Sequence, residues 1–151
     1  MPDRTRDRLV THAIAVLESE GIDAVTIRRV AREAGVSHGA PLRHFPTRAD
    51  LLAAVAATGF ARLQGLLEAP GVGRERLVAA CRSYVEFARS APALYDLMFR
   101  VCPMNEAAFE AFEKLLQGAP AGPLWATLYG LVHMGLADAV DETVANAIVS
   151  E

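Results

Sequence analysis

Arginine is the residue with the clearest binding chemistry in this chain, and it is concentrated between residues 26 and 48. This block holds Arg28, Arg29, Arg32, Arg43 and Arg48. A guanidinium group forms paired hydrogen bonds with phosphate oxygens and with the edge of guanine. The concentration of arginine therefore indicates a surface that binds an anionic partner.

Charge is divided unevenly along the chain. Residues 1–48 hold 8 arginines against 6 acidic residues, a net charge of +2, whereas residues 49–151 carry a net charge of −5. The whole chain has a net charge of −3 and a pI near 5.8, which excludes a uniformly basic nucleic-acid coat. A positively charged N-terminal region followed by a negatively charged remainder favours an anionic partner that binds the N-terminal region.

No group of residues in the sequence has the spacing of a catalytic or metal site. The chain lacks a G-x-S-x-G elbow, a phosphate-binding P-loop and an H-E-x-x-H motif. Glu110 and Glu113 share a predicted helix face, but no second carboxylate cluster joins them. We therefore expect no enzymatic activity, no cofactor and no bound metal.

The cysteines and the termini favour a cytoplasmic protein. Cys81 and Cys102 lie 21 residues apart, without the spacing of a disulfide framework or a zinc site. They are expected to be buried thiols in a reducing compartment. The charged N-terminus has no apolar signal core, and Pro120 and Pro123 interrupt the uncharged stretch 115–137, so no membrane span is expected there.

Helices are predicted to position the arginines. Thr26 is a plausible N-cap, Gly35 is suited to end a helix, and Ser37 is a second N-cap. Thr47 and Asp50 form a capping box. The expected helices of this half cover residues 3–20, 27–34, 37–45 and 47–68.

The second half also has helical periodicity, and no segment shows the alternation of a strand. Apolar residues recur at helical spacing, and Pro- and Gly-rich breaks separate the segments. The expected helices cover residues 74–90, a short stretch from Pro92, 105–117, 124–140 and, more weakly, 142–149. The fold class predicted is therefore all-α.

The block from Thr26 to Arg48 has the spacing of a helix-turn-helix. Ala31 is small enough for two helices to cross closely, and Gly35 permits the tight reversal between them. Ser37 would leave backbone N–H groups of the next helix pointing outward. From spacing alone, an ordinary three-helix packing unit with solvated arginines remains an alternative.

The sequence GIDAVTIRRVAREAGVSHGAPLRHFPTRADLLAAV resembles the N-terminal DNA-binding domain of the tetracycline-repressor (TetR) family of transcriptional regulators. The resemblance covers residues 4 to about 57. It implies phosphate contacts from Thr26 and Arg28, backbone contacts from His44 and Arg48, and a core position for Phe45. The DNA-binding residues that it implies are Thr26, Arg28, Ser37, His38, Gly39, Ala40, Leu42, Arg43, His44 and Arg48.

Two residues depart from the family pattern. Most members have Tyr where this chain has Leu42, and that Tyr usually binds phosphate, so a hydroxyl contact is missing. Pro41 stands where Leu is common and would remove a backbone bond at the fourth position of the expected helix. A branch of the family has Ala-Pro-Tyr at this place.

The second half resembles the TetR branch named for a Trp-His-Gly motif. The stretch YVEFARSAPALYDLMFR begins at Tyr84, and LWATLYGL supplies Trp125 and Gly130, with Tyr129 in place of His. The chain lacks a helix and linker that this branch usually has before Leu124, and the sequence leaves open whether that segment is deleted or omitted. The resemblance implies a ligand pocket, for which plain core packing is the alternative. Its expected lining is Tyr84, Phe87, Tyr95, Met98, Phe99, Phe112, Trp125 and Tyr129.

The sequence thus predicts a helix-turn-helix DNA-binding domain at residues 1–48 and a helical ligand-binding and dimerisation domain at residues 49–151. The expected function is that of a repressor that binds a palindromic operator on double-stranded DNA as a homodimer and is released by a small apolar effector. The dimer is expected to form through residues 124–140 and the last helix. The alternative is a helical dimer that has lost operator binding and acts through protein contacts, which the missing Tyr at position 42 favours.

Overall fold

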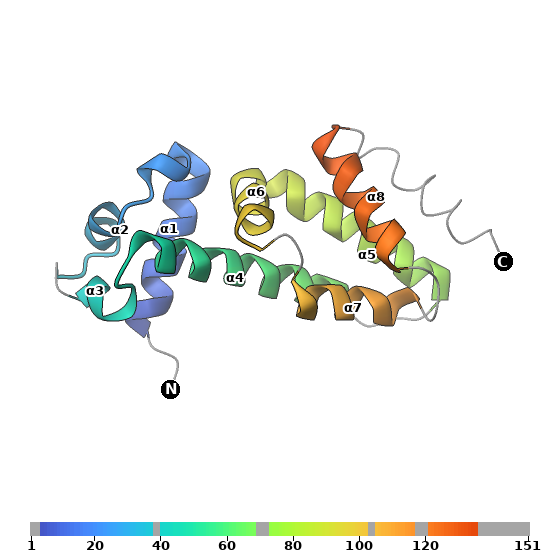
Figure 1. The fold of residues 1–151 in the computed structure, drawn as a ribbon, viewed down its shortest axis with the longest axis horizontal. Helices are drawn as coiled ribbons and strands as arrows, with labels where there is room; N and C mark the ends of the chain where they lie inside the picture. The colour runs from blue at the N-terminus through green and yellow to red at the C-terminus, as the bar shows by residue number, and fades with distance from the viewer. Residues whose placement is uncertain (1–3, 38–39, 69–72, 103–104, 117–120, 136–151) are drawn as a thin grey trace. The chain divides into compact units, whose positions relative to one another are not determined.

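The computed structural model describes residues 4–37, 40–68, 73–102, 105–116 and 121–135, and every regular element within these ranges is helical (Figure 1). The all-α prediction is confirmed for this part of the chain. Contacts between Cα atoms divide the chain into two compact units. The N-terminal unit comprises Met1–Gly59 and Ala91–Pro103, and the C-terminal unit comprises Phe60–Ser90 and Met104–Glu151.

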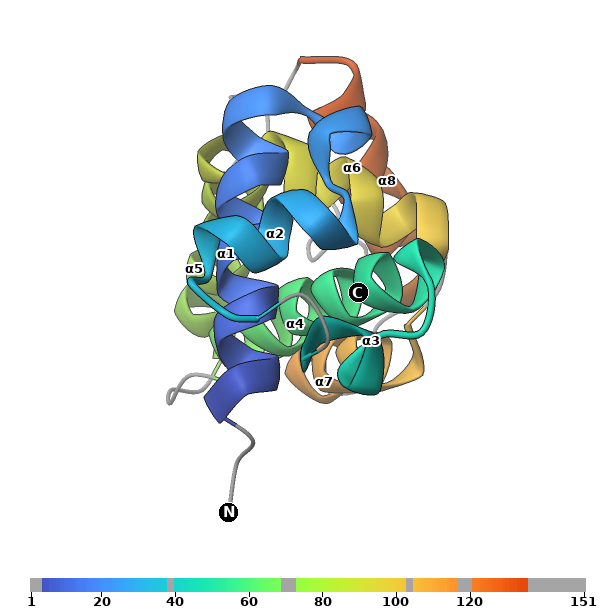
Figure 2. The same cartoon turned by 90° about the vertical axis from the view of Figure 1, so that its left-hand side faces the viewer.

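The N-terminal unit is built around its first helix. Helix α1 packs against η1, α2, α3 and α6, and α2 packs against α3 (Figure 2). One face of α1 lies in the core of this unit, because its apolar residues recur at helical spacing; they are Leu9, Val10, Ala13, Ile14, Val16 and Leu17. The elements are α1 (Arg4–Glu20), η1 (Ile22–Ala24), α2 (Ile27–Glu33), α3 (Ala40–His44), the first part of α4 (Arg48–Leu67) and α6 (Pro92–Val101).

The C-terminal unit contains the second part of α4, α5 (Gly73–Ser90), α7 (Glu106–Leu116) and α8 (Ala121–His133). Helices α5, α7 and α8 contact one another. At their centre, the Trp125 ring stands edge-on to the rings of Tyr84 and Phe109, with centroids 5.6 and 5.8 Å away. Tyr84 and Trp125 are buried, so this cluster is the aromatic core of the unit.

Most predicted helix boundaries agree with the structure to within one or two residues, but four differ. The connector after Gly21 forms the 3-10 turn η1. Helix α3 begins at Ala40 rather than at Ser37, so Pro41 occupies its second position, where a missing N–H costs no helical bond. Helix α8 begins at Ala121 rather than at Leu124, because Pro123 at its third position has no N–H that the helix needs. It ends at His133 rather than near Val140, because Gly135 adopts a φ of 70°, which ends a helix. The predicted helix 142–149 lies outside the described residues.

Helix α6 follows Ser90 in sequence, yet it belongs to the N-terminal unit. Its first backbone donors are capped by a side chain of α1: Glu18 accepts from Leu94 N at 2.7 Å and from Ala93 N at 3.4 Å. The local N-cap position, Ala91, has no capping side chain. A carboxylate at a helix N-terminus is favourable for both hydrogen bonding and the helix dipole. Glu18 thus links α6 to the helix that supports the helix-turn-helix.

Gly59 lies where α4 and α6 pack most closely within the N-terminal unit. A Cβ atom at this position would lie 2.4 Å from Met98 Sδ and 3.2 Å from Leu94 Cδ1. We expect Gly59→Ala to lower the free energy of unfolding by about 1–3 kcal/mol, because the added methyl overfills this contact.

The matched test of the Gly59 contact is a double-mutant cycle with Met98→Ala, measured by urea unfolding. The Met98→Ala change alone creates a cavity, whereas in the Gly59→Ala background it also relieves the clash. The cost of the double variant should therefore be smaller than the sum of the single costs by more than about 1 kcal/mol. If the costs of the two single substitutions added up to the cost of the double variant, residues 59 and 98 would not interact in the folded protein.

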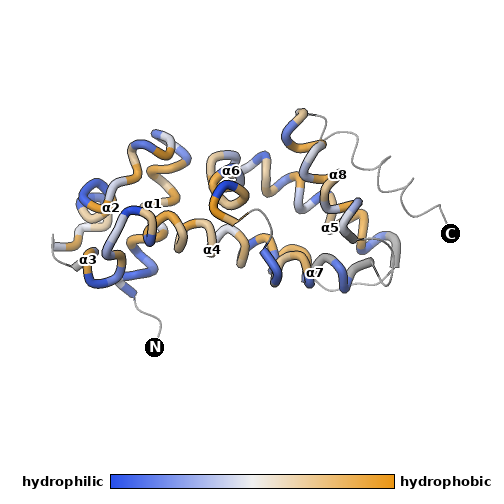
Figure 3. The backbone as a smooth tube through the Cα atoms, viewed as in Figure 1, coloured by the Kyte–Doolittle hydropathy of each residue, from blue (hydrophilic) through white to orange (hydrophobic). Residues whose placement is uncertain are grey.

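The apolar composition of α4 reflects its place in the core (Figure 3). Leu51, Val55, Leu63 and Leu67 are fully buried, and Arg62 and Glu68 are exposed. By length and mean hydropathy alone, α4 also meets the criterion for a membrane-crossing helix. That criterion is weak evidence, since the core helix of a globular protein meets it as well.

Candidate nucleic-acid interface

Helix α2 begins at a capping threonine, as the sequence predicts. Thr26 has extended backbone angles (φ −119°, ψ 151°), and its Oγ1 accepts a hydrogen bond from Arg29 N at 3.1 Å. This contact satisfies one of the free N–H groups at the helix start. The Thr26 side chain is exposed, so its hydroxyl still has a proton to donate to a phosphate oxygen.

The end of α2 is held by a glycine conformation and two hydrogen bonds. Gly35 has a φ of 62°, the left-handed conformation that glycine adopts readily. Val36 N donates to Ala31 O at 3.1 Å, and the guanidinium of Arg8 donates to Ala34 O. Arg8 therefore ties the end of α2 back to α1, and the predicted role of Gly35 is confirmed.

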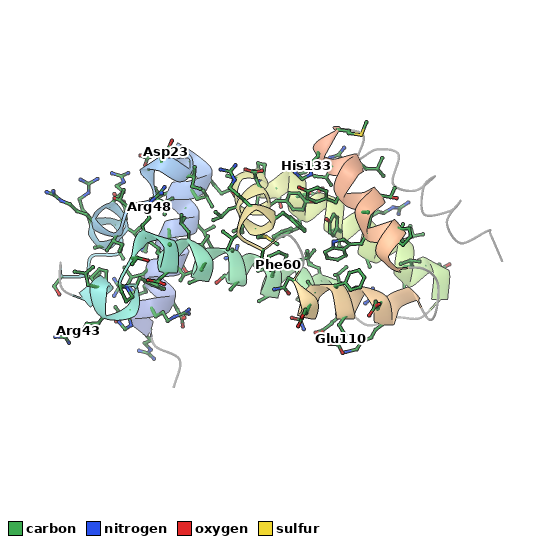
Figure 4. All side chains as sticks on the ribbon, in the orientation of Figure 1. Asp23, Arg43, Arg48, Phe60, Glu110 and His133 are labelled. Carbon is green, nitrogen blue, oxygen red and sulfur yellow. The ribbon has the colours of Figure 1, made fainter. Side chains whose placement is uncertain are left out.

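Burial fixes which face of α3 points outward. Pro41 and Phe45, one helical turn apart, are both buried, whereas Leu42 and Arg43 are exposed. Arg43 projects away from the helices of its unit (Figure 4). The guanidinium of Arg6 lies 5.5 Å from the centroid of the Phe45 ring, a cation–π contact that further fixes this ring. Phe45 is thus a core residue, as predicted.

Arg29 is neutralised by two carboxylates and is therefore a structural residue. Its Nη2 lies 2.6 Å from Glu20 Oε1 and its Nη1 lies 3.3 Å from Glu33 Oε1. The pair with Glu20 ties α2 to the end of α1, and the pair with Glu33 lies within α2. Arg28 and Arg32 are exposed on α2 and line a hollow of about 460 Å³ together with Thr26, Arg29, Ala31 and Val36. Arg32 Nε also lies 3.8 Å from Glu33 Oε1, so the charge of Arg32, although exposed, is partly compensated by that carboxylate.

Arg48 holds the connector between α1 and α2 in place. Its Nε donates to Val25 O at 2.7 Å and its Nη2 donates to Ile22 O at 2.5 Å. Arg48 lies inside a capping box, in which Asp50 N donates to Thr47 Oγ1 at 3.1 Å and Thr47 N donates to Asp50 Oδ2 at 2.9 Å. The capping box is confirmed. The two carbonyl contacts add a structural role to the predicted DNA contact of Arg48.

We expect Arg48→Ala to lower the free energy of unfolding by about 1–2 kcal/mol, because two charged hydrogen bonds to carbonyls are lost. Arg48→Lys should recover less than half of this loss, since an ammonium cannot bridge two carbonyls with the fork of a guanidinium. Urea unfolding measures both variants. Full recovery by Lys would show that only the charge of Arg48 matters.

The structure brings part of the predicted DNA-binding set together on the N-terminal unit. Thr26, Arg28, Ser37, Leu42 and Arg43 are exposed. His44 is half-buried, while His38, Gly39 and the side chain of Ala40 lie outside the described residues. Sequence reasoning did not find the carbonyl contacts of Arg8 and Arg48, because each joins residues more than 20 positions apart.

The predicted ligand-lining set is divided between the two units. Tyr84, Phe87 and Trp125 are buried in the C-terminal unit, and Tyr129 is half-buried there. Tyr95, Met98 and Phe99 are buried in the N-terminal unit. The side chain of Phe112 lies outside the described part. A ligand pocket formed by these residues stays a prediction.

The two cysteines differ in burial. Cys81 is fully buried, and desolvation raises the pKa of its thiol to about 12. It is therefore a poor nucleophile at neutral pH. Cys102 is only half-buried, so the expectation of two buried thiols holds for Cys81 alone. In the described ranges, no group of three or more His, Cys, Asp or Glu residues could hold a metal ion.

The capped α2, the glycine turn and the outward face of α3 define a helix-turn-helix protein. Residues 9–55 match the family described as bacterial regulatory proteins, tetR family. The chain therefore carries a tetR-family N-terminal domain, and its all-α fold is that of TetR-family proteins.

Relatives and solved structures agree with this assignment. The HTH-type transcriptional regulator SrpR of Pseudomonas putida is 36% identical over 56 residues, which cover 37% of this chain and 26% of SrpR. The chain spans between about a quarter and just over half of the curated relatives it matches.

Similar solved structures extend over nearly the whole chain. A protein of unknown function from Rhodococcus sp. RHA1 is 33% identical, with a TM-score of 0.73, and covers 95% of this chain and 91% of its own. A TetR-family member from Streptomyces coelicolor A3 (22% identical, TM-score 0.73, coverage 96% and 98%) shares the fold. So does the multidrug binding protein EbrR in complex with ethidium (20% identical, TM-score 0.71, coverage 97% and 99%).

Proposed function

We propose that this protein is a DNA-binding transcriptional regulator that represses transcription from a near-palindromic operator as a homodimer. The observation that carries this proposal is the outward face of α3, where Leu42 and Arg43 are exposed while Pro41 and Phe45 hold the helix in the core. A helix held in this way presents its exposed side chains to base edges in the major groove. A regulator of this kind acts in the cytoplasm, where the bacterial chromosome lies.

Exposed groups around α3 have the chemistry to hold the duplex backbone. Arg28 and Arg32 supply cationic charge on α2, and Thr26 supplies a hydroxyl at the start of that helix. Contacts of this type position a protein on DNA without distinguishing sequences. Base selectivity then depends on α3, with Arg43 as its one charged exposed side chain among the described residues of that helix.

The proposal is tested by selecting bound fragments from a genomic library with the purified protein. We expect enrichment of fragments that share an inverted repeat, with the region upstream of the protein's own gene among them. Arg43→Ala serves as the matched control, because it leaves the fold and most phosphate contacts in place. If wild type and Arg43→Ala enriched the same fragments equally, the proposed role of α3 would be wrong.

The proposed dimer forms through the outer face of α8. Gly122, Ala126, Gly130 and Met134 recur every fourth residue, and Met134 is 72% exposed. A Cβ atom added at Gly122 or Gly130 would meet nothing within 4 Å, so this face is open within the described structure. Small residues in such a row let two helices approach closely, and a two-fold axis would pair the row with itself.

Sedimentation tests this interface. We expect wild type to sediment as a dimer at micromolar concentration and Ala126→Glu as a monomer, because the substitution places two carboxylates against each other without water. Ala79→Glu is the matched control, since Ala79 is an exposed alanine on α5. It should remain dimeric. A monomeric wild type, or a dimeric Ala126→Glu, would contradict the proposed interface.

We further propose that a small, mostly apolar effector binds among the helices of residues 74–130 and lowers operator affinity. The support is the aromatic cluster of Tyr84, Phe109 and Trp125, together with the fold shared with ethidium-bound EbrR. An effector acts only through a difference in affinity between two conformations. By reciprocity, operator DNA must weaken effector binding by the same factor.

Ala88→Trp tests the effector proposal, because Ala88 is a small buried residue of α5 that a large ring would replace. A panel of hydrophobic cations and acids is titrated against the protein with and without operator. Ala88→Trp should remove the effector response while operator binding is retained. Effector binding that left operator affinity unchanged would contradict the proposal.

The alternative function, a helical dimer that acts only through protein contacts, rests on the missing Tyr at position 42. The comparisons do not favour it, because residues 9–55 match a family of regulatory proteins and SrpR is named as a transcriptional regulator.

A further inference from the structure

Leu42 is a large apolar side chain exposed on an otherwise polar and cationic surface. Its exposed fraction is 55%, and it lies on α3 beside the exposed Arg43. The other large hydrophobic residues exposed in the described structure are Leu66, Val101 and Met134, none of which lies on α2 or α3. A single exposed leucine is common on protein surfaces and does not by itself indicate a partner. Leu42 differs in its place, because it lies on the helix that is proposed to enter the major groove.

The helix cannot rotate to bury Leu42. Pro41 precedes it and Phe45 follows one turn after Pro41, and both are buried. The contact of Arg6 with the Phe45 ring, at 5.5 Å, holds the same face inward. Since neighbouring residues on an α-helix point about 100° apart, Arg43 points directly away from the buried face of Pro41 and Phe45, and Leu42 lies on the flank of α3 next to it.

We propose that Leu42 is a specificity residue that contacts the C5-methyl group of a thymine in each half of the operator. This inference rests on the proposed function. The thymine methyl is the one apolar group that base pairs present in the major groove. Against another base edge, a leucine would exclude the water that hydrogen-bonds to a donor or acceptor of the base. It would offer no hydrogen bond in place of that water, which is unfavourable.

The position of Arg43 constrains where this thymine lies. Arg43 follows Leu42 directly, and a guanidinium pairs best with O6 and N7 of guanine. Adjacent residues of one helix turn reach base pairs that are close neighbours, because the helix rises only about 1.5 Å per residue. The operator half-site should therefore contain a thymine and a guanine within about two base pairs of each other, with the thymine contacted by Leu42.

Replacing thymine with deoxyuridine tests this contact, since it removes the methyl group and leaves base pairing intact. Each thymine of the selected operator is replaced in turn, symmetrically in both half-sites, and affinity is measured by fluorescence anisotropy at fixed salt. One replacement should weaken wild-type binding about fourfold per half-site, or about fifteenfold for the pair, which corresponds to one methyl group returned to water.

Two variants make this experiment specific. Leu42→Ala should lose most of the sensitivity to deoxyuridine at that position, and as an exposed substitution it should leave the fold unchanged. Arg43→Ala should bind more weakly but keep the sensitivity. As a second measurement, 5-methylcytosine placed at positions without a thymine contact should leave wild-type affinity unchanged.

The outcomes separate this inference from the proposed function. A wild-type protein that bound no duplex selectively would overturn both. Selective binding with no affected thymine would overturn the Leu42 contact alone. If Leu42→Ala weakened the thymine and deoxyuridine operators by the same factor, Leu42 would contact sugar or phosphate, and the proposed methyl contact would be wrong.

Discussion

Arg43→Ala is expected to lower affinity for the operator by about 10- to 100-fold for each half-site, which corresponds to about 1–3 kcal/mol per contact. Arg43 is the charged exposed side chain of α3, and a paired contact with guanine cannot be replaced by a methyl group. The loss of affinity should depend on the contacted guanine. An operator in which that guanine is changed should therefore bind wild type and Arg43→Ala with nearly equal affinity. Anisotropy titrations with the two duplexes measure this double-mutant cycle.

Arg28→Ala is the matched control for Arg43→Ala. Arg28 is also exposed, but it lies on α2, where we propose that it contacts the phosphate backbone. Its loss should weaken binding to all sequences alike and reduce the slope of log affinity against log salt by about 1. If Arg43→Ala showed this same uniform loss, Arg43 would be a phosphate contact rather than a base contact.

Phe45→Ala is expected to unfold the helix-turn-helix. The Phe45 ring is 3% exposed, and removing a buried phenylalanine side chain costs about 3–5 kcal/mol. That loss is comparable with the whole stability of many domains, which is about 5–15 kcal/mol. Since Phe45 sets which face of α3 points outward, operator binding should fall together with stability.

Phe45→Leu is the control for this position, because leucine fills much of the same volume and should cost less than about 1.5 kcal/mol. Urea unfolding followed by circular dichroism measures stability, and the same samples are titrated with operator. If Phe45→Ala unfolded at the same urea concentration as wild type, the ring would not be a core residue of the folded protein in solution.

The local features of the fold could be predicted from the sequence because each depends on a few neighbouring residues. The cap at Thr26, the glycine turn at Gly35 and the capping box at Thr47 are all confirmed. The inward position of Phe45, which the family resemblance implies, is confirmed as well. These features set the helix ends locally, whereas Arg8 and Arg48 hold the same region through contacts from segments distant in sequence.

The long-range contacts could not be predicted in this way. Glu18 caps α6 from 76 residues away, and Arg48 donates to carbonyls of a turn that precedes it by more than 20 residues. Gly59 is buried under Met98 of α6, although its own neighbours in sequence do not indicate a close crossing. Sequence periodicity identifies a buried face but not the element that covers it.

The end of α8 shows the limit of hydropathy patterns. The apolar stretch after Leu124 predicted a helix to about Val140, yet the helix ends at His133. Gly135 adopts positive φ, and this single residue outweighs the continuing apolar composition.

The central claim is sequence-selective DNA binding through α3, and a competition titration tests it most directly. The selected operator and a shuffled duplex of the same length and composition are titrated against the full chain at physiological salt. We expect the operator to bind at least about 1,000-fold more tightly than the shuffled duplex. Equal affinity for the two duplexes at every salt concentration would contradict the claim and leave only nonspecific phosphate binding.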